Sequence, residues 1–591
     1  MVTLWQGQSG RDAAKWQATR ARSRKREAAS AKPQARSRLR LRGRLRASRK
    51  FASVGLRWQF RSTTPMRKAV AVFRACFLFL APLTLGLVSI PAPAAPPNGL
   101  AKQLDALIEG PDYKHATWGI VVVNAKTGET VYERNPEAML APASVTKLFS
   151  CAAALVAIGP DSTAETVVYQ RGARVNGTLH GDLILVAAGD LTFGGRTKDG
   201  KTVFQNHDHT YANSGLGECA LTDTDPLAAL NDLAKQVKAA GINQIDGEIA
   251  IDDRLFVRTR SSGSGPDAVS PILVNDNLVD ILIAPGAKPG DPAKVTTRPE
   301  SGYYQCDSLV TTSDEKSAAS VQLLPVGANQ FAVRGKIPVG SKPLLRIYPI
   351  DDPTQFARSL FIEALRRNGV KPSAAVLRQA LTILPTKDAY AELTKVASFQ
   401  SPPFREAIAV TLKVSHNLYA STLPCLIAAS KGQETVEAGL REERKILEKL
   451  GVDVSQISFG GGAGGASADH VTARATVQLL QGMAKRPEWD AYKAGLPIMG
   501  VDGTLADVVG ADSPVRGKVF AKTGTLVWFD AANERVLLKS KALAGTMTTK
   551  AGTPLYLAIF VNNVPLPTGI GPGREGKLLG KLCEILHDAG P

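Results

Sequence analysis

Cysteine is scarce in this sequence, which spreads six cysteines over 591 residues and contains no C-x-x-C pair. Structural zinc sites and disulfide-rich scaffolds need closely spaced thiols, so the sequence argues against both. If a disulfide forms at all, we expect it between Cys219 and Cys306; the alternative is that these cysteines are free thiols. The composition, with 44% hydrophobic and 21% charged residues, excludes a wholly disordered or collagen-like chain.

Most of the chain also lacks net charge. The formal charge of +19 comes from residues 1–74, which hold 21 Lys and Arg against two acidic residues. The remainder is neutral and has no long-range attraction for nucleic acid, so we predict no nucleic-acid partner. The arginine-rich stretch Arg36–Arg46 is the one basis for the opposite view. We interpret residues 1–65 as a basic leader that is disordered, or as a start placed upstream of the true one at Met66.

No apolar run is long enough to span a membrane comfortably. Ala75–Ile90 has 16 residues without a charge, whereas a bilayer needs about 20. Basic residues precede this run, and Pro91-Ala92-Pro93-Ala94 follows it in the manner of a cleavage site. This predicts a signal peptide at 66–94 and a periplasmic or secreted protein that meets the membrane only transiently. The alternative is an uncleaved anchor.

Hydrophobic patterns predict an α/β fold in three parts. Residues 95–172 and 373–591 should form one domain, interrupted by a mostly β inserted region at 173–372. The predicted strands are Trp118–Asn124, Glu129–Glu133, Leu183–Ala187, Glu248–Ile251, Leu278–Ile283, Gly517–Lys522 and Leu555–Val564. The predicted helices are Leu148–Ile158, Pro226–Ala240, Asp352–Asn368, Pro403–Ser415, Leu418–Ser430, Thr435–Leu450 and Glu575–His587.

The first candidate catalytic motif is Ser144-Val145-Thr146-Lys147, at the start of a predicted helix. One helical turn separates its serine from its lysine, so the hydroxyl and the amine share a face and can form a hydrogen bond. A serine hydroxyl is a weak nucleophile unless a base removes its proton, and a lysine among apolar neighbours has a pKa low enough to do so. Alone, this spacing is frequent by chance.

Two further motifs follow. Ser415-His416-Asn417 lies between two predicted helices, where its hydroxyl can relay a proton and its amide can orient a carbonyl. Lys522-Thr523-Gly524-Thr525 lies on a predicted edge strand. There the glycine leaves room for a ligand backbone, and the lysine offers positive charge to a substrate carboxylate. The three motifs together, in this order and local structure, are far less frequent by chance than any one of them.

With these motifs the chain resembles the D-Ala-D-Ala carboxypeptidase/endopeptidases among the low-molecular-mass class C penicillin-binding proteins. The resemblance extends over residues 100–590, and that family is similar in carrying a long insertion between its first and second motifs. Further matching segments are Leu140–Leu148, Asn275–Val279, Leu496–Leu505, Gly524–Leu526 and Ala544–Met547. The resemblance implies a transpeptidase-like domain of the penicillin-binding-protein/β-lactamase kind, with an antiparallel sheet and helices.

The resemblance also implies a role for each matching residue. Ser144 is expected to be the acylated nucleophile, Lys147 its general base and Ser415 the proton relay. The residues expected to bind substrate are Asn417, Lys522, Thr523 and Thr525. The backbone N–H groups of Ser144 and Thr525 are expected to form the oxyanion hole.

The implied activity is hydrolysis of peptidoglycan stem peptides or cross-links through an acyl-enzyme, without a metal or other cofactor. β-Lactam antibiotics are expected to acylate the same serine. One alternative is a β-lactamase, although the sequence lacks the Glu-x-x-Leu-Asn segment that activates water in class A enzymes. Another is a catalytically weak relative that only binds cell wall, whose signature would be a broken Ser-x-x-Lys motif.

Several segments depart from the family pattern or remain open. Gly461–Ala466 lacks the polar side chains that the family has after its second motif, and His416 replaces a common Asp. The stretch Trp528–Lys541 is additional and is expected at the rim of the cleft. His207-Asp208-His209 has the side chains of a metal site but no clear third ligand nearby, so we predict no metal. Asp502-Gly503 is interpreted as a turn below the site rather than a catalytic acid.

Overall fold

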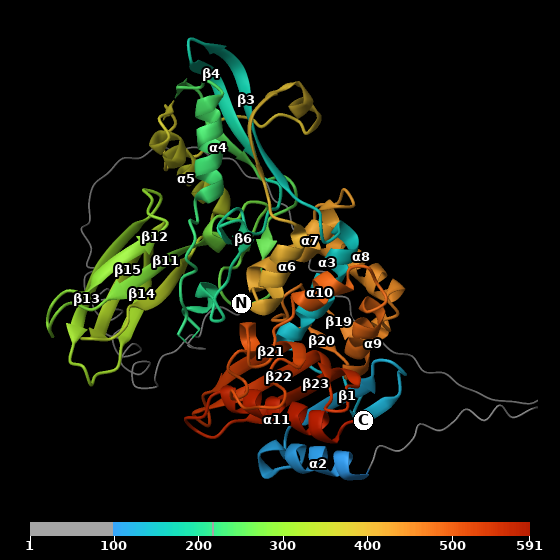
Figure 1. Ribbon diagram of the computed structural model, residues 1–591. Helices are drawn as coiled ribbons and strands as arrows, with labels where there is room; N and C mark the ends of the chain where they lie inside the picture. Colours follow the sequence, from blue (N-terminus) through green and yellow to red (C-terminus); the bar gives the residue numbers. More distant parts are fainter. Residues whose placement is uncertain (1–97, 215–217) are drawn as a thin grey trace, which may run out of the picture. The chain divides into compact units, whose positions relative to one another are not determined.

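The computed structural model describes residues 98–214 and 218–591, which belong to one compact unit. The predicted signal peptide and the basic leader lie outside the described residues. A five-stranded antiparallel sheet in the order β2-β1-β23-β22-β21 organises the site (Figure 1). Its strands are β1 (Thr117–Asn124), β2 (Thr130–Arg134), β21 (Val519–Asp530), β22 (Arg535–Thr548) and β23 (Pro554–Pro565). The first and last strands of the domain thus pair, and β21 forms an edge.

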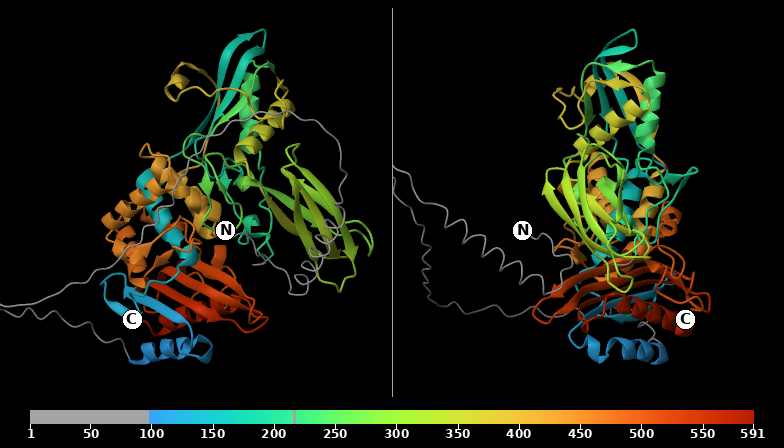
Figure 2. Two further views of the ribbon diagram at one scale, coloured as in Figure 1. Left: turned by 180° about the vertical axis from the view of Figure 1, so that it is seen from behind. Right: turned by 90° about the vertical axis from the view of Figure 1, so that its left-hand side faces the viewer.

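Both faces of this sheet are covered, because its strands carry apolar side chains on alternating positions. In β1, Val121 belongs to the core on one face and Val122 to the core on the other. Helices α2 (Asn98–Ile108) and α11 (Gly573–Ala589) cover the face of Val122, and a cluster of helices covers the opposite face (Figure 2). Among the described residues, no helix is both long and apolar enough to cross a bilayer.

The helical cluster is centred on α3, whose residues from Thr146 to Leu155 are all buried. Side-chain caps explain where several helices begin: His416 accepts from Tyr419 N, and Thr435 accepts from Ala438 N. The predicted helices are confirmed, with ends displaced by a few residues. The helices of the cluster are α3 (Thr146–Ile158), α6 (Phe404–Lys413), α7 (Asn417–Ala429), α8 (Val436–Lys449), α9 (Ala473–Met483) and α10 (Trp489–Ala494).

The chain between α3 and α6 is mostly β, as the sequence suggested. A six-stranded sheet packs against α4 (Ala228–Ala239) and α5 (Pro353–Arg367). Its strands are β3 (Glu165–Val175), β4 (Thr178–Val186), β7 (Gln244–Ile245), β8 (Ile249–Asp252), β17 (Lys371–Pro372) and β18 (Thr394–Gln400). Strand β3 crosses residue 172, and β18, which pairs with it, lies wholly beyond residue 372. The boundaries proposed from the sequence for the inserted region, residues 173 and 372, therefore stay predictions.

Two three-stranded sheets complete this region. One has the order β12-β11-β16 and the other β13-β15-β14. Their strands are β11 (Leu278–Ala284), β12 (Lys294–Arg298), β13 (Gln305–Ser313), β14 (Ser320–Gly327), β15 (Gln330–Pro338) and β16 (Leu344–Pro349). Short two-stranded pairs are β5 (Thr197–Lys198) with β6 (Lys201–Thr202), β9 (Thr259–Arg260) with β10 (Ala268–Val269), and β19 (Ile457–Ser458) with β20 (His470–Val471). Cys306 has a free thiol, which decides against a disulfide with Cys219.

Candidate active site

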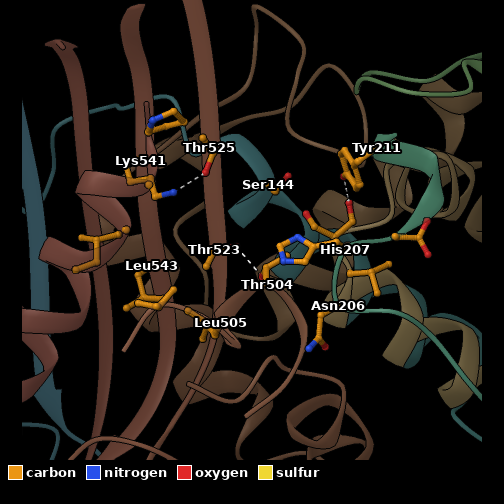
Figure 3. A pocket seen from close by; sticks show the side chains of 18 of the residues that line it. Ser144, Asn206, His207, Tyr211, Thr504, Leu505, Thr523, Thr525, Lys541 and Leu543 are labelled. Atoms are coloured by element: carbon orange, nitrogen blue, oxygen red, sulfur yellow. Dashed lines mark hydrogen bonds between the residues drawn. The ribbon is translucent and has the colours of Figure 1, made fainter. Parts of the chain in front are cut away.

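The three motifs meet at the edge strand β21. Ser144, Ser415, Thr523 and Thr525 border one cavity of about 250 Å³ (Figure 3). Ser144 lies in a short 3-10 turn, Ala143–Val145, directly before α3, and Ser415 lies between α6 and α7. Four of the seven residues predicted for the site therefore line a common cavity. The other three, Lys147, Asn417 and Lys522, are buried and do not border it.

The first motif has the predicted serine–lysine contact. The Lys147 Nζ atom lies 2.9 Å from Ser144 Oγ. The lysine is fully buried, and this burial lowers its pKa to about 7 although Cys151 and Asp469 oppose the shift. Near neutral pH a large fraction of the amine is thus unprotonated and has a lone pair to offer.

The two other contacts of Lys147 determine where this lone pair points. Its Nζ lies 2.7 Å from Asn417 Oδ1 and 2.8 Å from the carbonyl oxygen of Ala463. Both oxygens can only accept hydrogen bonds, so they take the two N–H groups of a neutral amine. The lone pair is then left for the hydroxyl proton of Ser144. This is the arrangement of a general base beside a nucleophile.

A loop from the inserted region fixes the orientation of Asn417. Its Nδ2 donates to the carbonyl oxygen of Ser264 at 2.9 Å, and this oxygen accepts only, so Oδ1 must face Lys147. Gly263 lies so close that a Cβ atom there would be 2.4 Å from Asn417 Cγ. The sequence alone did not indicate a role for the loop at Ser261–Gly265, because Ser and Gly indicate a turn without showing what the turn contacts.

The segment that departs from the family pattern is part of the site. Besides the carbonyl of Ala463, it places Gly464 so close to the first motif that a Cβ atom would lie 1.9 Å from the carbonyl oxygen of Ala143. The Asp469 carboxylate holds this loop by accepting from Gly460 N and Ala466 N, each at 2.8 Å. Small residues are required here because backbone meets backbone.

Left-handed backbone occurs at the second motif serine and directly before the first. Ala143, directly before the nucleophile, has φ 47°, and Ser415 has φ 62°. Both are non-glycine residues in a region that costs energy, so the surrounding structure must hold them there. Tyr211 from the inserted region contributes by donating a hydrogen bond to the carbonyl oxygen of Ser415.

The third motif turns its side chains to opposite faces of β21. Thr523 and Thr525 face the cavity: Thr523 Oγ1 lies 2.8 Å from Thr504 Oγ1, and Thr525 Oγ1 lies 2.9 Å from Lys541 Nζ. Lys522 points to the other face, where its Nζ donates to the carbonyl oxygen of Thr523 at 2.8 Å. Burial, and then the nearby Lys147, hold the pKa of Lys522 well below its usual value.

Gly524 and the turn at Asp502 allow the three motifs to pack closely. A Cβ atom on Gly524 would lie 2.4 Å from the carbonyl oxygen of Pro142, so this strand position must be small. Asp502 accepts from Lys413 Nζ at 2.6 Å and from Ile498 N at 2.8 Å, which agrees with a structural turn.

A buried network of charges joins the inserted region to the second motif. Arg196 contacts the carboxylates of Asp208 and Asp276 at 2.5 and 2.6 Å. His209 lies between Asp276 and Asp280, at 2.7 and 2.6 Å. Burial alone would lower the pKa of His209, but Asp280 and Asp208 raise it to about 10, so this histidine is charged at neutral pH.

Asp276 connects the network to α7. Its Oδ1 accepts from the Tyr419 hydroxyl at 2.6 Å and lies 3.6 Å from His416 Nε2. Asp276 and its neighbours Asn275 and Asn277 all have positive φ, between 48° and 55°. The segment Asn275–Val279 matched the family in the sequence, and the structure shows what it contacts.

The sequence His207-Asp208-His209 does not act as one chelating unit. His207 borders the cavity and lies 3.2 Å from Asp507, whereas His209 is buried in the charge network. Asp208, His209 and Asp276 do bring ligand atoms within 4.8 Å of one another. The guanidinium of Arg196 and the charged imidazole of His209, however, already pair with the two carboxylates.

Comparison with known proteins gives consistent results. Residues 100–571 match the model of the D-Ala-D-Ala carboxypeptidase 3 (S13) family. A D-alanyl-D-alanine carboxypeptidase of Actinomadura sp. (strain R39) is 30% identical over 452 residues, which are 72% of this chain and 76% of that one. The D-alanyl-D-alanine carboxypeptidase DacB of Haemophilus influenzae is 24% identical over 463 residues, covering 75% of this chain and 85% of the other.

The fold agrees as well. The crystal structure of penicillin-binding protein 4 from H. influenzae covers 82% of this chain and 99% of its own, with a TM-score of 0.61 and 20% identity. The same protein has also been solved with a β-lactam bound. The predictions of fold class, family and enzyme class are thereby confirmed. The chain belongs to the D-Ala-D-Ala carboxypeptidase 3 (S13) family of penicillin-binding proteins, which are serine-type hydrolases.

Proposed function

We propose that Ser144 attacks the carbonyl carbon of the penultimate D-Ala in peptidoglycan stem peptides that end in D-Ala-D-Ala. Lys147 takes the Ser144 proton as the bond to the carbonyl carbon forms. The hydrogen bonds of Lys147 carry this proposal, because two accept-only oxygens leave the amine lone pair for the Ser144 hydroxyl alone.

The remaining steps use the other motif residues. In this proposal, the backbone N–H groups of Ser144 and Thr525 stabilise the oxyanion of the tetrahedral intermediate. Ser415 relays a proton to the leaving amine of the terminal D-Ala, and Asn417 positions both Lys147 and the substrate. Thr523 and Thr525 receive the substrate carboxylate, and Lys522 supports this strand from its other face through the carbonyl oxygen of Thr523. Water then hydrolyses the acyl-enzyme and releases the shortened peptide.

Cleavage of cross-links is part of the same proposal. A cross-link also offers a D-Ala carbonyl to the nucleophile, so the chemistry at Ser144 does not change. Peptidoglycan lies outside the cytoplasmic membrane, and an exported protein meets it there. The apolar run at 75–90 supports export through a signal peptide, and β-lactams are expected to act as acylating inhibitors.

Covalent labelling tests the proposal. Wild-type protein incubated with a labelled penicillin should gain the mass of one penicillin on Ser144. Ser144→Ala should show no adduct and an unchanged unfolding midpoint, because only one partly exposed hydroxyl is lost. An adduct that maps to Ser415, or that persists in Ser144→Ala, would contradict the assignment.

A further inference from the structure

Lys541 lies beside the carboxylate-binding part of the proposed site, and none of the three motifs includes it. It stands directly opposite Thr525 in the register of β22 with β21. Its Nζ lies 2.9 Å from Thr525 Oγ1, and Figure 3 shows the side chain extending toward this hydroxyl. Lys541 also borders the same cavity as Ser144 and Thr525.

The bond between the two side chains has a defined direction. An ammonium group can only donate, so Thr525 Oγ1 accepts and keeps its own hydroxyl proton for another acceptor. A carboxylate in the cavity is such an acceptor. We propose that Lys541 is a positioning residue for substrate recognition: it orients the Thr525 hydroxyl and places a positive charge directly behind the C-terminal carboxylate of the substrate. This inference rests on the function proposed above.

The other cation near the third motif is less suited to this task. Lys522 is fully buried, its Nζ is bonded to the carbonyl oxygen of Thr523, and it faces Lys147 on the opposite side of the strand. Thr523 itself is bonded to Thr504, a neutral residue. Of the two threonines of the third motif, Thr525 is therefore the one with a cation behind it.

The surroundings of Lys541 keep it charged and add to the positive potential. Burial lowers the pKa of Lys541 to about 8 and the carboxylate of Glu575 opposes this, so most of the amine is protonated at pH 7. Glu575 is itself paired with Arg574. Gly573 and Gly576, in the first turn of α11, also border the cavity. The N-terminal end of a helix favours negative charge.

The test compares two substrates that differ only in this charge. One is an acyl-D-Ala-D-Ala peptide with a free carboxylate, and the other is its C-terminal amide. Lys541→Met should lower kcat/KM for the free acid by roughly 10- to 100-fold, the usual effect of losing a hydrogen bond to a charged group. The rate with the amide should stay nearly constant. Lys541→Arg should keep most of the preference for the acid.

Two further variants complete the design. Lys539→Met removes an equal charge from the same strand, where the lysine is exposed and lies 3.1 Å from Asn563 Oδ1; the preference should not change. Thr525→Val should lose the preference, and adding Lys541→Met to it should cause little further loss, because the lysine acts through the hydroxyl. Unfolding midpoints show that the variants are folded.

Three outcomes would overturn the inference. They are equal losses on acid and amide in Lys541→Met, full additivity of the two substitutions, and an effect of Lys539→Met as large as that of Lys541→Met. In each of these, the function proposed for Ser144 still stands if wild type cleaves the acid and Ser144→Ala does not. If wild type cleaves neither substrate and forms no penicillin adduct, the proposed function itself fails.

Discussion

The site is built as much from backbone atoms as from side chains. Lys147 is the central example: the three-residue spacing from Ser144 predicted one of its contacts, which the structure shows at 2.9 Å. The contact of Lys147 with the carbonyl oxygen of Ala463 could not be predicted, because every residue has a backbone carbonyl and the sequence does not show which one a side chain will contact. The same holds for the carbonyl of Ser264 that orients Asn417.

Acylation should depend on pH through Lys147. With a pKa of about 7, this amine is protonated and unable to accept a proton at pH 5, and it becomes available as the pH rises through 7. The rate of penicillin acylation should therefore increase between pH 5 and 8. Lys147→Ala should lower the rate by roughly 10²- to 10⁴-fold. A flat profile of the wild type would exclude Lys147 as the titrating base.

At the scale of elements, the Gly-rich loop after α8 supports the nucleophile. Gly464→Ala should reduce acylation by roughly 100-fold, since the new Cβ atom would displace the carbonyl of Ala143, one residue before Ser144. Gly451→Ala is a matched control: Gly451 also has a positive φ, but a Cβ atom there meets nothing within 4 Å. The Gly451→Ala variant should lose about 1 kcal/mol of unfolding free energy and keep the wild-type acylation rate. Equal rates for the two variants would contradict this role of the loop.

The charge network predicts that the inserted region stabilises the second motif. Asp276→Asn leaves Arg196 and His209 with less negative charge in a buried site, so unfolding in urea should show a loss of about 3–5 kcal/mol. Asp246→Asn in the same region is the control. Asp246 is 40% exposed and paired with His180 at 2.9 Å, so its loss should cost less than about 1 kcal/mol. A smaller effect of Asp276→Asn than of this control would show that the network does not stabilise the fold.

The elements differ in how well the sequence predicted them. Helices α3, α7 and α8 were visible because long apolar runs or good caps mark them. Strand β22 was not, because charged residues such as Arg535 and Lys539 interrupt its apolar pattern. Trp528–Lys541, expected only as rim, is the tip of this hairpin, and its last residue borders the cavity. The contacts of the three left-handed residues Asn275–Asn277 could not be predicted, because no sequence pattern indicates which side chains they meet.

At the scale of the whole molecule, charge separates the leader from the enzyme. If the segment 66–94 is removed on export, the mature chain starts near Ala95 or Pro96 and carries equal numbers of basic and acidic residues. N-terminal sequencing of the native protein should find this start. On a cation exchanger at pH 7 the mature protein should elute early, whereas a chain that keeps residues 1–74 should be retained. A native chain beginning before Met66 would contradict both the processing and the localisation proposed above.

The pairing of β1 with β23 also constrains the order in which the protein can be made. Thr117–Asn124 hydrogen-bonds along its length to Leu555–Asn562, near the end of the chain. Until the ribosome has delivered those residues, β1 has only β2 beside it, and an isolated two-stranded hairpin is marginally stable in water. Contacts between such distant segments also slow folding. The central sheet is therefore assembled after synthesis, and a chain truncated before Pro554 should be unable to build it.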